Sequence, residues 1–382
     1  AGGTADPEAA AAWARHRRAC APGAGDSEAA GDSERGRAVS FDLRGVSYRL
    51  NEERRLLQDL SFTVAGGMKV AVMGASGSGK TTLLSVLSGR CGDGRFEGEM
   101  TLNGALVLPW QMASLRPLIG YVPQDDVMHM TLSVRENISF CAALRSAMQT
   151  SVDAAEWPPP SESASGSADE SHGRGEACKG HQKLSARVDA IIDGLGLAHV
   201  ADRAINDGLS GGQRKRASIG MELVSKPRIL LLDEPSTGLD AATAHRILEV
   251  VLGCAASEQC TTFSTIHQPR WTTLSLFDML VLLAPGGHLC FAGPVMAVKA
   301  YFQEVLHVEF PEGENPADII IDVCTFDSAR RMAVDGQWRS PPQCLRAVLF
   351  PTPEAVGEDC RAHWQLEEFG QMLAALWAGF SG

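Results

Sequence analysis

One glycine-rich segment constrains this chain more than any other feature. Residues 74–81 read Gly-Ala-Ser-Gly-Ser-Gly-Lys-Thr, and they follow the short apolar run 70–73. In a phosphate loop, glycines at this spacing let successive backbone N–H groups point at a phosphate, and the helix that follows adds its N-terminal dipole. The segment therefore predicts a strand, a phosphate-binding turn and a helix over 81–87, in that order.

Each position of this loop has an expected role. Lys80 would neutralise the β- and γ-phosphate oxygens, and the Thr81 hydroxyl would ligate Mg²⁺. The alternative is a chance glycine-rich turn, which should occur in roughly a few per cent of chains of this length. The position of the loop between a strand and a helix lowers that figure. The predicted phosphate contacts are Gly74, Ala75, Ser76, Gly77, Ser78, Gly79, Lys80, Thr81 and Thr82.

A second apolar strand supplies carboxylates. Residues 229–232 read Ile-Leu-Leu-Leu, and Asp233 and Glu234 follow directly. Parallel sheets bind ligands at the carboxyl ends of their strands. We therefore expect Asp233 to hold Mg²⁺ and Glu234 to take a proton from an attacking water. Asp233 alone is about as compatible with a helix N-cap, but the accompanying phosphate loop favours the metal role.

The composition excludes several classes of protein. A content of 45% hydrophobic and 21% charged residues is typical of globular chains. A formal net charge of −12 argues against a nucleic-acid partner, because phosphate binding needs basic surface. The cysteines form neither a CxxC pair nor a cluster with histidines, so neither a zinc site nor a disulfide framework is indicated. No apolar run reaches the roughly 20 residues of a membrane helix.

The order of predicted elements indicates the fold class. From residue 69 onward, short apolar strands alternate with helical segments, which predicts a parallel sheet covered on both faces. Before it, apolar residues alternate with polar ones over 39–50, which predicts half-buried antiparallel strands. Ser133 and Glu136 have capping-box spacing and would begin a helix. We therefore expect an α/β fold: a mixed central sheet with an antiparallel β subdomain and an inserted α-helical subdomain.

Composition also suggests domain boundaries. Residues 1–37 are rich in Ala, Gly and acidic residues, and we interpret them as a disordered leader. The folded domain is expected over 38–324, with its helical subdomain at about 125–222. Within that subdomain, the proline- and serine-rich residues 149–182 predict a flexible insertion. Residues 325–382 would form a C-terminal extension that leads towards a transmembrane domain.

A signature motif separates this chain from other proteins with a phosphate loop. Leu-Ser-Gly-Gly-Gln, residues 209–213, lies shortly before the strand that ends in Asp233. In this respect the sequence resembles the ABC ATPases, a branch of the P-loop NTPases. The resemblance implies that Ser210, Gly211, Gly212 and Gln213 contact the γ-phosphate of ATP held by a partner domain.

The remaining motifs occur in the order that this family shows. The resemblance implies that Gln124 senses Mg²⁺ and the attacking water, and that Asp240 belongs to a loop at the dimer contact. His267 matches the switch histidine that reaches the γ-phosphate, although a lone histidine after a strand is more often structural. Tyr48 would stack on adenine, although an aromatic residue in an alternating strand is more often part of the core. The implied catalytic set is Glu234, His267, Gln124 and Lys80, and the implied metal set is Thr81, Gln124 and Asp233.

Several stretches resemble the G subfamily, the white-brown complex half-transporters of plant and algal type. They are VPQDDVM at 122–128, SGGQRKR at 210–216, IHQPR at 266–270 and NPAD at 315–318. The resemblance implies an ATPase domain on the cytoplasmic face of a membrane, joined to membrane helices on the same polypeptide. One phosphate loop and one signature per chain imply a homo- or heterodimer of such domains, with ATP sandwiched between them.

Two alternatives compete with a transporter. A soluble ABC ATPase with a non-transport role usually carries two cassettes or long coiled-coil insertions, and neither is visible here. A catalytically inactive regulatory cassette is disfavoured because Lys80, Ser210, Asp233, Glu234 and His267 are all intact. The transported compound is not indicated by the sequence.

Overall fold

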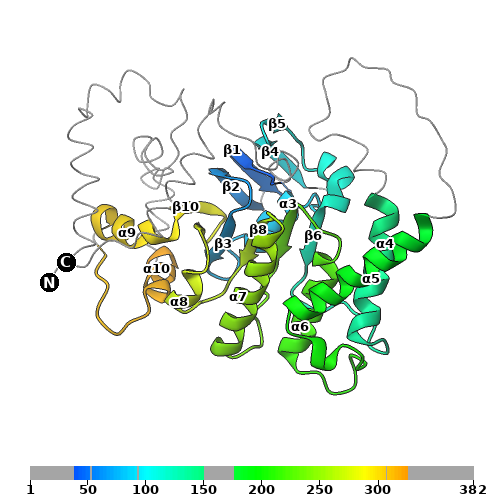
Figure 1. The fold of residues 1–382 in the computed structure, drawn as a ribbon. Coiled ribbons are helices and arrows are strands. Elements are labelled where there is room, and N and C mark those ends of the chain that lie inside the picture. The colour runs from blue at the N-terminus through cyan, green and yellow to red at the C-terminus, as the bar shows by residue number, and fades with distance from the viewer. Residues whose placement is uncertain (1–37, 52–53, 93, 150–175, 307, 326–382) are drawn as a thin grey trace, which may run out of the picture.

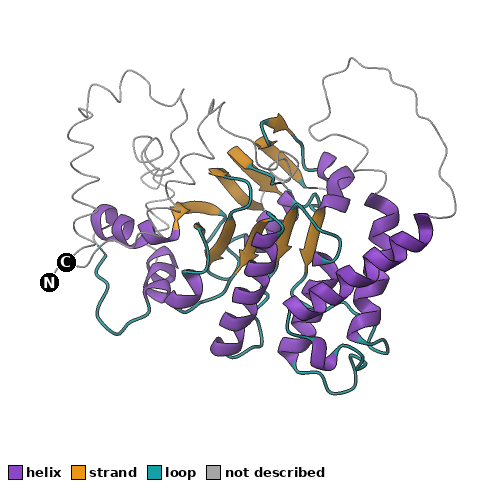
Figure 2. Ribbon diagram, in the orientation of Figure 1, coloured by secondary structure: helices purple, strands orange, loops and turns teal. Residues whose placement is uncertain are grey.

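A computed structural model describes residues 38–51, 54–92, 94–149, 176–306 and 308–325 of the chain. A curved sheet occupies the middle of the molecule, with helices against both of its faces (Figures 1 and 2). Helices α4, α5 and α6 gather at one end of the sheet, and α8, α9 and α10 gather at the other (Figure 1). The expected combination of a mixed sheet, a β subdomain and an inserted helical subdomain is confirmed.

The bounds of the elements are as follows. The strands are β1 (Phe41–Arg49), β2 (Arg55–Val64), β3 (Lys69–Gly74), β4 (Arg95–Leu102), β5 (Ala105–Leu106), β6 (Ile119–Val122), β7 (Ile229–Leu232), β8 (Thr261–Thr265), β9 (Met279–Ala284) and β10 (His288–Pro294). The α-helices are α3 (Lys80–Leu87), α4 (Val134–Gln149), α5 (Glu176–Gly194), α6 (Gly211–Leu223), α7 (Ala241–Ser257), α8 (Trp271–Leu274), α9 (Val298–Leu306) and α10 (Pro316–Thr325). The 3₁₀ helices are η1 (Gln111–Leu118), η2 (Ala198–Val200) and η3 (Val295–Ala297).

The sheet combines a parallel and an antiparallel part. Its strand order is β5-β4-β1-β2-β10-β9-β3-β8-β7-β6. Strands β9, β3, β8, β7 and β6 run parallel to one another, whereas β1 pairs antiparallel with both β2 and β4. Because β3 and β7 each neighbour β8 in parallel, the phosphate loop after β3 and the carboxylates after β7 emerge at the same edge.

The central strand β3 is apolar throughout because it is covered on both faces. Val70 and Val72 pack in the cluster that also contains α3 and the antiparallel strands. Ala71 and Met73 point to the other face, into the cluster formed with α7, α8 and α10. This is the burial expected of a parallel strand with helices on both sides, and it anchors the phosphate loop at its end.

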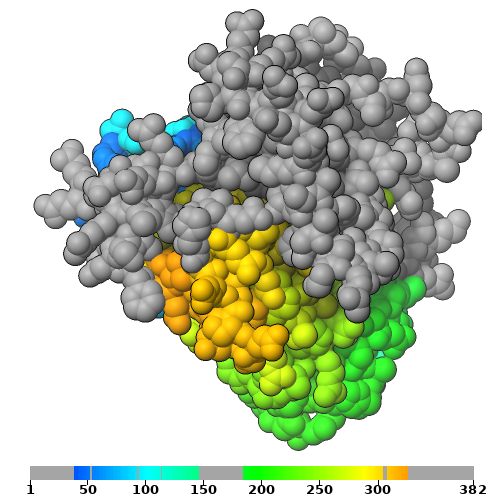
Figure 3. Space-filling model, turned by 90° about the vertical axis from the view of Figure 1, so that its left-hand side faces the viewer, coloured from blue at the N-terminus to red at the C-terminus, as the bar shows by residue number. Residues whose placement is uncertain are grey.

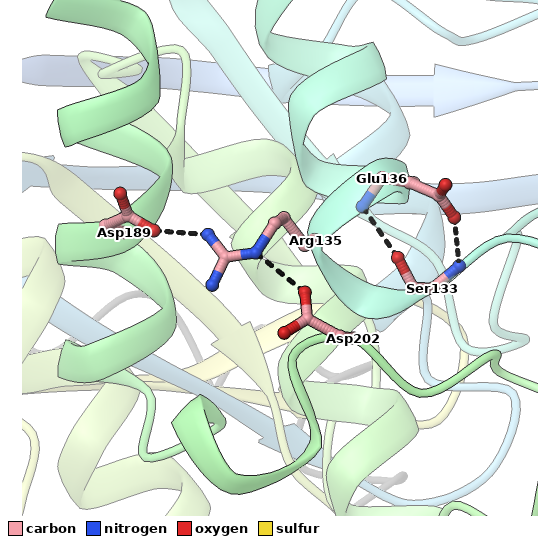
Figure 4. Close-up of polar contacts among 5 residues, drawn as sticks. All are labelled: Ser133, Arg135, Glu136, Asp189 and Asp202. Atoms are coloured by element: carbon pink, nitrogen blue, oxygen red, sulfur yellow. Dashed lines mark hydrogen bonds and ion pairs between the residues drawn. The ribbon is translucent and has the colours of Figure 1, made fainter.

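The helical subdomain begins at a capping box. Ser133 Oγ accepts a hydrogen bond from Glu136 N at 3.2 Å, and Glu136 Oε2 accepts one from Ser133 N at 2.8 Å (Figure 4). The box satisfies backbone donors that have no partner in the first turn of α4, which confirms the predicted helix start. Beside it, Arg135 forms ion pairs with Asp189 of α5 and with Asp202 of the turn after η2 (Figure 4).

The last described elements close one end of the sheet. In a view from that side, the yellow and orange surface of the residues after about 280 adjoins the yellow-green surface of α7 and its neighbours (Figure 3). Buried side chains of α8, α9 and α10 share one apolar cluster with β9 and β10. Among the helices that the structure describes, none combines the length and the apolar composition that a membrane crossing requires.

The flexible insertion predicted over residues 149–182 extends too far at its C-terminal end. Residues 149–182 were expected to be flexible, but α5 already begins at Glu176. Residues 161–182 contain no proline, and residues 176–182 carry alanine, lysine and glutamine, which favour a helix. Residues 150–175, the predicted leader 1–37 and the C-terminal extension from 326 lie outside the described residues. The domain bounds 38–324 and 125–222 therefore stay predictions.

Replacing Ser133 with alanine should destabilise the helical subdomain by about 1 kcal/mol, because α4 loses its side-chain cap. The measurement is the midpoint of urea unfolding. Glu136→Gln is the control, since glutamine also completes a capping box and should leave the midpoint nearly unchanged. An equal loss in both variants would contradict the capping role of Ser133.

Candidate functional site

The phosphate loop is built from glycine positions that no other residue can occupy. Gly74 has φ 150°, and a Cβ there would lie 2.3 Å from Leu283 O and 2.5 Å from Ser78 Oγ. Gly79, the N-cap of α3, has φ 94°, and its Cβ would lie 2.7 Å from Leu56 O. Both conformations favour glycine, and both positions are closed by backbone atoms. The loop is therefore pressed between β9 and the start of β2.

Lys80 lies inside this loop. It is 6% exposed, and its Nζ donates hydrogen bonds to Gly74 O at 2.9 Å and to Ala75 O at 3.0 Å. Burial lowers the pKa of its ammonium group, while Glu234 and Asp233 act in the opposite direction. Beside it, Ser78 is fully buried, and its Oγ has no hydrogen-bond partner among the described residues. The loop thus holds a cation and a spare hydroxyl next to two carboxylates.

Asp233 is the best-connected carboxylate of the site. Its Oδ1 accepts hydrogen bonds from Thr81 Oγ1 at 3.2 Å and from Thr265 Oγ1 at 2.8 Å. Its Oδ2 accepts one from the Tyr121 hydroxyl at 3.4 Å. Asp233 is 5% exposed, so these donors supply the hydrogen bonds that water would make to an exposed carboxylate. Thr81 and Asp233, both predicted metal ligands, are therefore adjacent.

Glu234 points differently because the backbone turns at this residue. Its φ of 46° lies in the left-handed region, which is uncommon for a residue with a side chain. Its N–H donates to Thr265 Oγ1 at 2.7 Å, and its Oε2 accepts a hydrogen bond from Thr237 Oγ1 at 2.8 Å. The half-buried carboxylate is thereby separated from the Asp233 cluster, and one of its oxygens is fixed.

The signature motif begins helix α6 with a second capping box. Gln213 N donates to Ser210 Oγ at 3.3 Å, and Gln213 Oε1 accepts a hydrogen bond from Ser210 N at 2.9 Å. Ser210 is exposed, whereas a Cβ on the buried Gly212 would lie 3.1 Å from Thr243 Cγ2 of α7. Asp240 caps α7 by accepting from the N–H groups of Ala242 and Thr243. A side-chain hydrogen bond with Thr243, followed by these backbone hydrogen bonds, lowers the pKa of its carboxyl. Neither Ser210 nor Asp240 is bonded to the phosphate loop.

His267 is exposed at the end of β8, on a loop that Asn315 anchors. Asn315 Oδ1 accepts a hydrogen bond from Trp271 N at 3.1 Å, and its Nδ2 donates to Pro269 O at 2.9 Å. The Asn315 side chain thus spans the loop on both sides of Arg270, immediately before α10. The NPAD segment, used above only as a sign of resemblance, holds the histidine loop in place.

Tyr48 does not occupy the predicted position. It is 3% exposed within the core of the β subdomain, and its hydroxyl donates to Gly92 O at 3.3 Å. A ring buried on the inward face of β1 is not available to stack on adenine, so this expectation disagrees with the structure. The exposed apolar side chain at this end of β1 is Leu50, at 48%.

Two contributors were missed by sequence reasoning. Thr265 contacts both Asp233 and the backbone of Glu234, and Tyr121 contacts Asp233 while Arg90 lies 4.4 Å above its ring. Burial, with a smaller contribution from Asp233, raises the pKa of Tyr121 to about 12. No local motif marks either residue. Their role depends on β6 and β8 flanking β7, which is a property of the sheet order.

The residues fit Mg²⁺ and a nucleotide phosphate. The adjacent oxygens of Thr81 and Asp233 are hard ligands of the kind that Mg²⁺ prefers. Lys80, the free Ser78 hydroxyl and the α3 N-terminus lie in one cradle that a Cβ at Gly74 would fill. Gln124, the third predicted metal ligand, is exposed on the loop after β6.

Comparison with protein families gives two matches. A family described as ABC transporter matches residues 57–237, which include the phosphate loop, the signature and both carboxylates. A family described as ABC-2 type transporter matches residues 267–335. The described part of this second match, up to residue 325, contains α8, β9, β10, α9 and α10 of the domain above.

Several curated proteins are similar over most of this chain. The broad substrate specificity ATP-binding cassette transporter ABCG2 of Rattus norvegicus is 38% identical over 298 residues, which is 77% of this chain and 40% of that protein. ABC transporter G family member 28 of Arabidopsis thaliana is 35% identical over 75% of this chain and 22% of its own length. The putative white-brown complex homolog protein 30 of the same plant is 33% identical over 71% and 22%. This chain thus spans less than half the length of these relatives.

A solved structure supports the fold. The chain of cbiO1 from Clostridium perfringens, part of the ABC transporter complex cbiONQ, matches with a TM-score of 0.53 and 21% identity. The match covers 70% of this chain and 92% of that one. At this identity the likeness concerns the fold alone, and it agrees with the mixed sheet and helical subdomain described above.

Lys80→Ala should raise the dissociation constant for Mg-ATP at least about tenfold, because charged hydrogen bonds to the phosphates are lost. Isothermal titration calorimetry on the purified chain measures this. Lys226→Ala is a matched control, because Lys226 is also a lysine but its side chain is 44% exposed and pairs with Glu258. Equal affinities in the wild type and the Lys80 variant would remove Lys80 from the nucleotide site.

Proposed function

This chain belongs to the ABC transporter family and, within it, to the G subfamily; from that premise we propose that it binds and hydrolyses ATP to power a half-transporter. The transported compound is a hydrophobic or lipid-like molecule, exported across a membrane. The domain lies on the cytoplasmic face, and a transmembrane domain follows on the same full-length polypeptide. The similarity to G-family transporters favours this function over that of a soluble ABC ATPase.

One arrangement of residues supports the proposal above all. Lys80, Thr81, Asp233 and Glu234 come from two segments of the chain more than a hundred residues apart, yet they meet at one edge of the sheet. Phosphoryl transfer needs this combination, since the protein acts chiefly by positioning groups and stabilising charge. A cation, a metal-binding pair and a separately oriented carboxylate are all present.

The residues divide the chemistry among themselves. Mg²⁺, when bound, would neutralise charge on the β- and γ-phosphate oxygens, and Thr81, Asp233 and Gln124 would hold it. Glu234 accepts the proton of the attacking water on its second carboxylate oxygen, because Thr237 already binds the first. His267 is exposed, on a loop held by Asn315, and from there it contacts the γ-phosphate.

A second subunit completes the site. The exposed N-terminus of α6 presents the Ser210 hydroxyl and the amides of Gly211 and Gly212. Ser210 Oγ already accepts from Gln213 N, so its own proton remains to donate to a phosphate of the partner subunit. Two such chains then bury two nucleotides between them with two-fold or pseudo-two-fold symmetry, and Asp240 lies at the contact.

The transmembrane domain docks on an apolar surface beside Gln124. We define the α4 patch as Val127, Met130, Phe140 and Leu144, which are 71%, 47%, 47% and 55% exposed. The loop part of this patch is fixed to α4: the His129 ring lies 5.5 Å from that of Phe140, and Asn137 bonds to both backbone groups of His129. Exposed apolar clusters of this kind mark interaction sites.

Glu234→Gln should retain ATP binding and lose turnover by about two to four orders of magnitude, because the amide does not accept the proton of water. With ATP but no hydrolysis, the dimer should accumulate, as measured by light scattering after gel filtration. Glu249→Gln on the exposed side of α7 is the control and should hydrolyse ATP normally. Normal turnover in the Glu234 variant contradicts the assigned base.

Leu144→Glu should lower the melting temperature of the full-length protein in detergent by about 2–4 °C, since a buried apolar contact is lost. The melting temperature of the present chain alone should not change, because Leu144 is 55% exposed in it. Leu106→Glu, on the opposite edge strand β5 and 60% exposed, should affect neither protein. A drop in the isolated chain, or none in the full-length protein, contradicts docking at the α4 patch.

A further inference from the structure

Lys215 is a charged residue in an unusual place. It lies on α6, one and a half turns after Ser210, and is 4% exposed. A buried ammonium group destabilises the fold unless an opposite charge and hydrogen-bond acceptors surround it. The partners of Lys215 therefore indicate why the charge is there.

All the partners of Lys215 lie on one loop. Its Nζ forms an ion pair with Asp126 Oδ1 at 2.8 Å and donates to Gln124 O at 2.8 Å and to Pro123 O at 3.4 Å. The two backbone carbonyls accept the hydrogen bonds of the ammonium group, whereas Asp126 Oδ1 is close enough for an ion pair but does not have hydrogen-bond geometry. The loop concerned begins directly after β6 and carries the Gln124 side chain.

Helix α6 joins this loop to the signature motif as a rigid body. Lys215 lies about 7.5 Å along the helix axis from Ser210, at a rise of 1.5 Å per residue. The helix is held by close packing: a Cβ at Gly212 would lie 3.2 Å from Ile247 of α7, and one at Gly220 would lie 3.0 Å from Leu195. A displacement of the Gln124 loop therefore moves α6 and Ser210 with it. If the loop moved without the helix, Lys215 would lose Asp126 and its buried charge would be unpaired.

We infer that Lys215 is a positioning residue that couples the two ATP sites of the dimer. The inference rests on the proposed function, in which Gln124 serves the nucleotide bound by its own subunit while Ser210 closes the site of the partner subunit. The Lys215–Asp126 pair then connects Gln124, which contacts Mg²⁺ and water at one ATP site, to Ser210, which contacts the phosphate at the other ATP site. It transmits occupancy of one site to the geometry of the next.

The test compares ATP binding with cooperativity of hydrolysis. Lys215→Met removes the charge and keeps an unbranched side chain that is one atom shorter, and Asp126→Asn removes the charge with the same shape. Binding of Mg-ATP to the purified chain should change less than about twofold, since neither side chain contacts the phosphate loop. In the full-length protein, turnover should fall about tenfold, and the Hill coefficient for ATP should drop from above one to one. The double variant should be no slower than Lys215→Met, because both changes break one interaction.

Arg187→Met provides a matched control. Arg187 is 18% exposed, forms an ion pair with Glu258 at 2.5 Å and donates to Leu223 O, so its loss also breaks a shielded ion pair near α6. None of these hydrogen bonds or ion pairs involves the Gln124 loop. We expect a lower melting temperature and an unchanged Hill coefficient.

The outcomes separate the inference from the proposed function. A wild-type protein that does not hydrolyse ATP overturns both. If the wild type hydrolyses ATP but is not cooperative, or if Asp126→Asn and Lys215→Met keep its Hill coefficient, only the coupling role is overturned. An equal loss of cooperativity in Arg187→Met also overturns it, because the effect would then reflect stability alone. Should Lys215→Met fail to fold, Asp126→Asn decides the question.

Discussion

The parallel alignment of β3, β8 and β7 is the constraint on which the site depends. It brings the phosphate loop and the acidic end of β7 to one edge of the sheet. At the end of β8, the Thr265 hydroxyl donates to Asp233 Oδ1 and accepts from Glu234 N. Asp233 Oδ1 lies 3.2 Å from Thr81 Oγ1 because these strands keep a common register. Backbone hydrogen bonds of the sheet thus set the distance between the proposed metal ligand Asp233 and the phosphate loop.

The helical subdomain carries the groups that we propose to act on a neighbouring subunit. Its helices are joined by apolar packing and by ion pairs whose side chains are partly shielded from water, as between Arg145 and Glu222. Lys215 is more buried than either of these residues, and its pair with Asp126 lies where the subdomain meets the sheet. Such a pair contributes little net stability compared with apolar packing, but breaking it is costly, which makes it suited to fixing a geometry.

The sequence alone determined the features that depend on neighbouring residues. The phosphate loop, the apolar strand before Asp233 and the capping box at Ser133 all rest on contacts between residues a few positions apart. Because their hydrogen bonds and backbone conformations are local, the residue types suffice to predict them. The alternation of strands and helices likewise indicated a parallel sheet, which is confirmed.

Only the tertiary structure decided which distant side chains complete the site. Thr265 and Tyr121 reach Asp233 because β8 and β6 flank β7, and no local pattern specifies that order. Tyr48 is buried because its face of β1 packs against the core. The alternation of apolar and polar residues predicts a strand with two different faces, but it does not indicate which face a ligand contacts. The partners of Lys215 lie about 90 residues away in sequence. Contacts across such separations depend on how the chain packs, and packing is a property of the whole fold rather than of any segment.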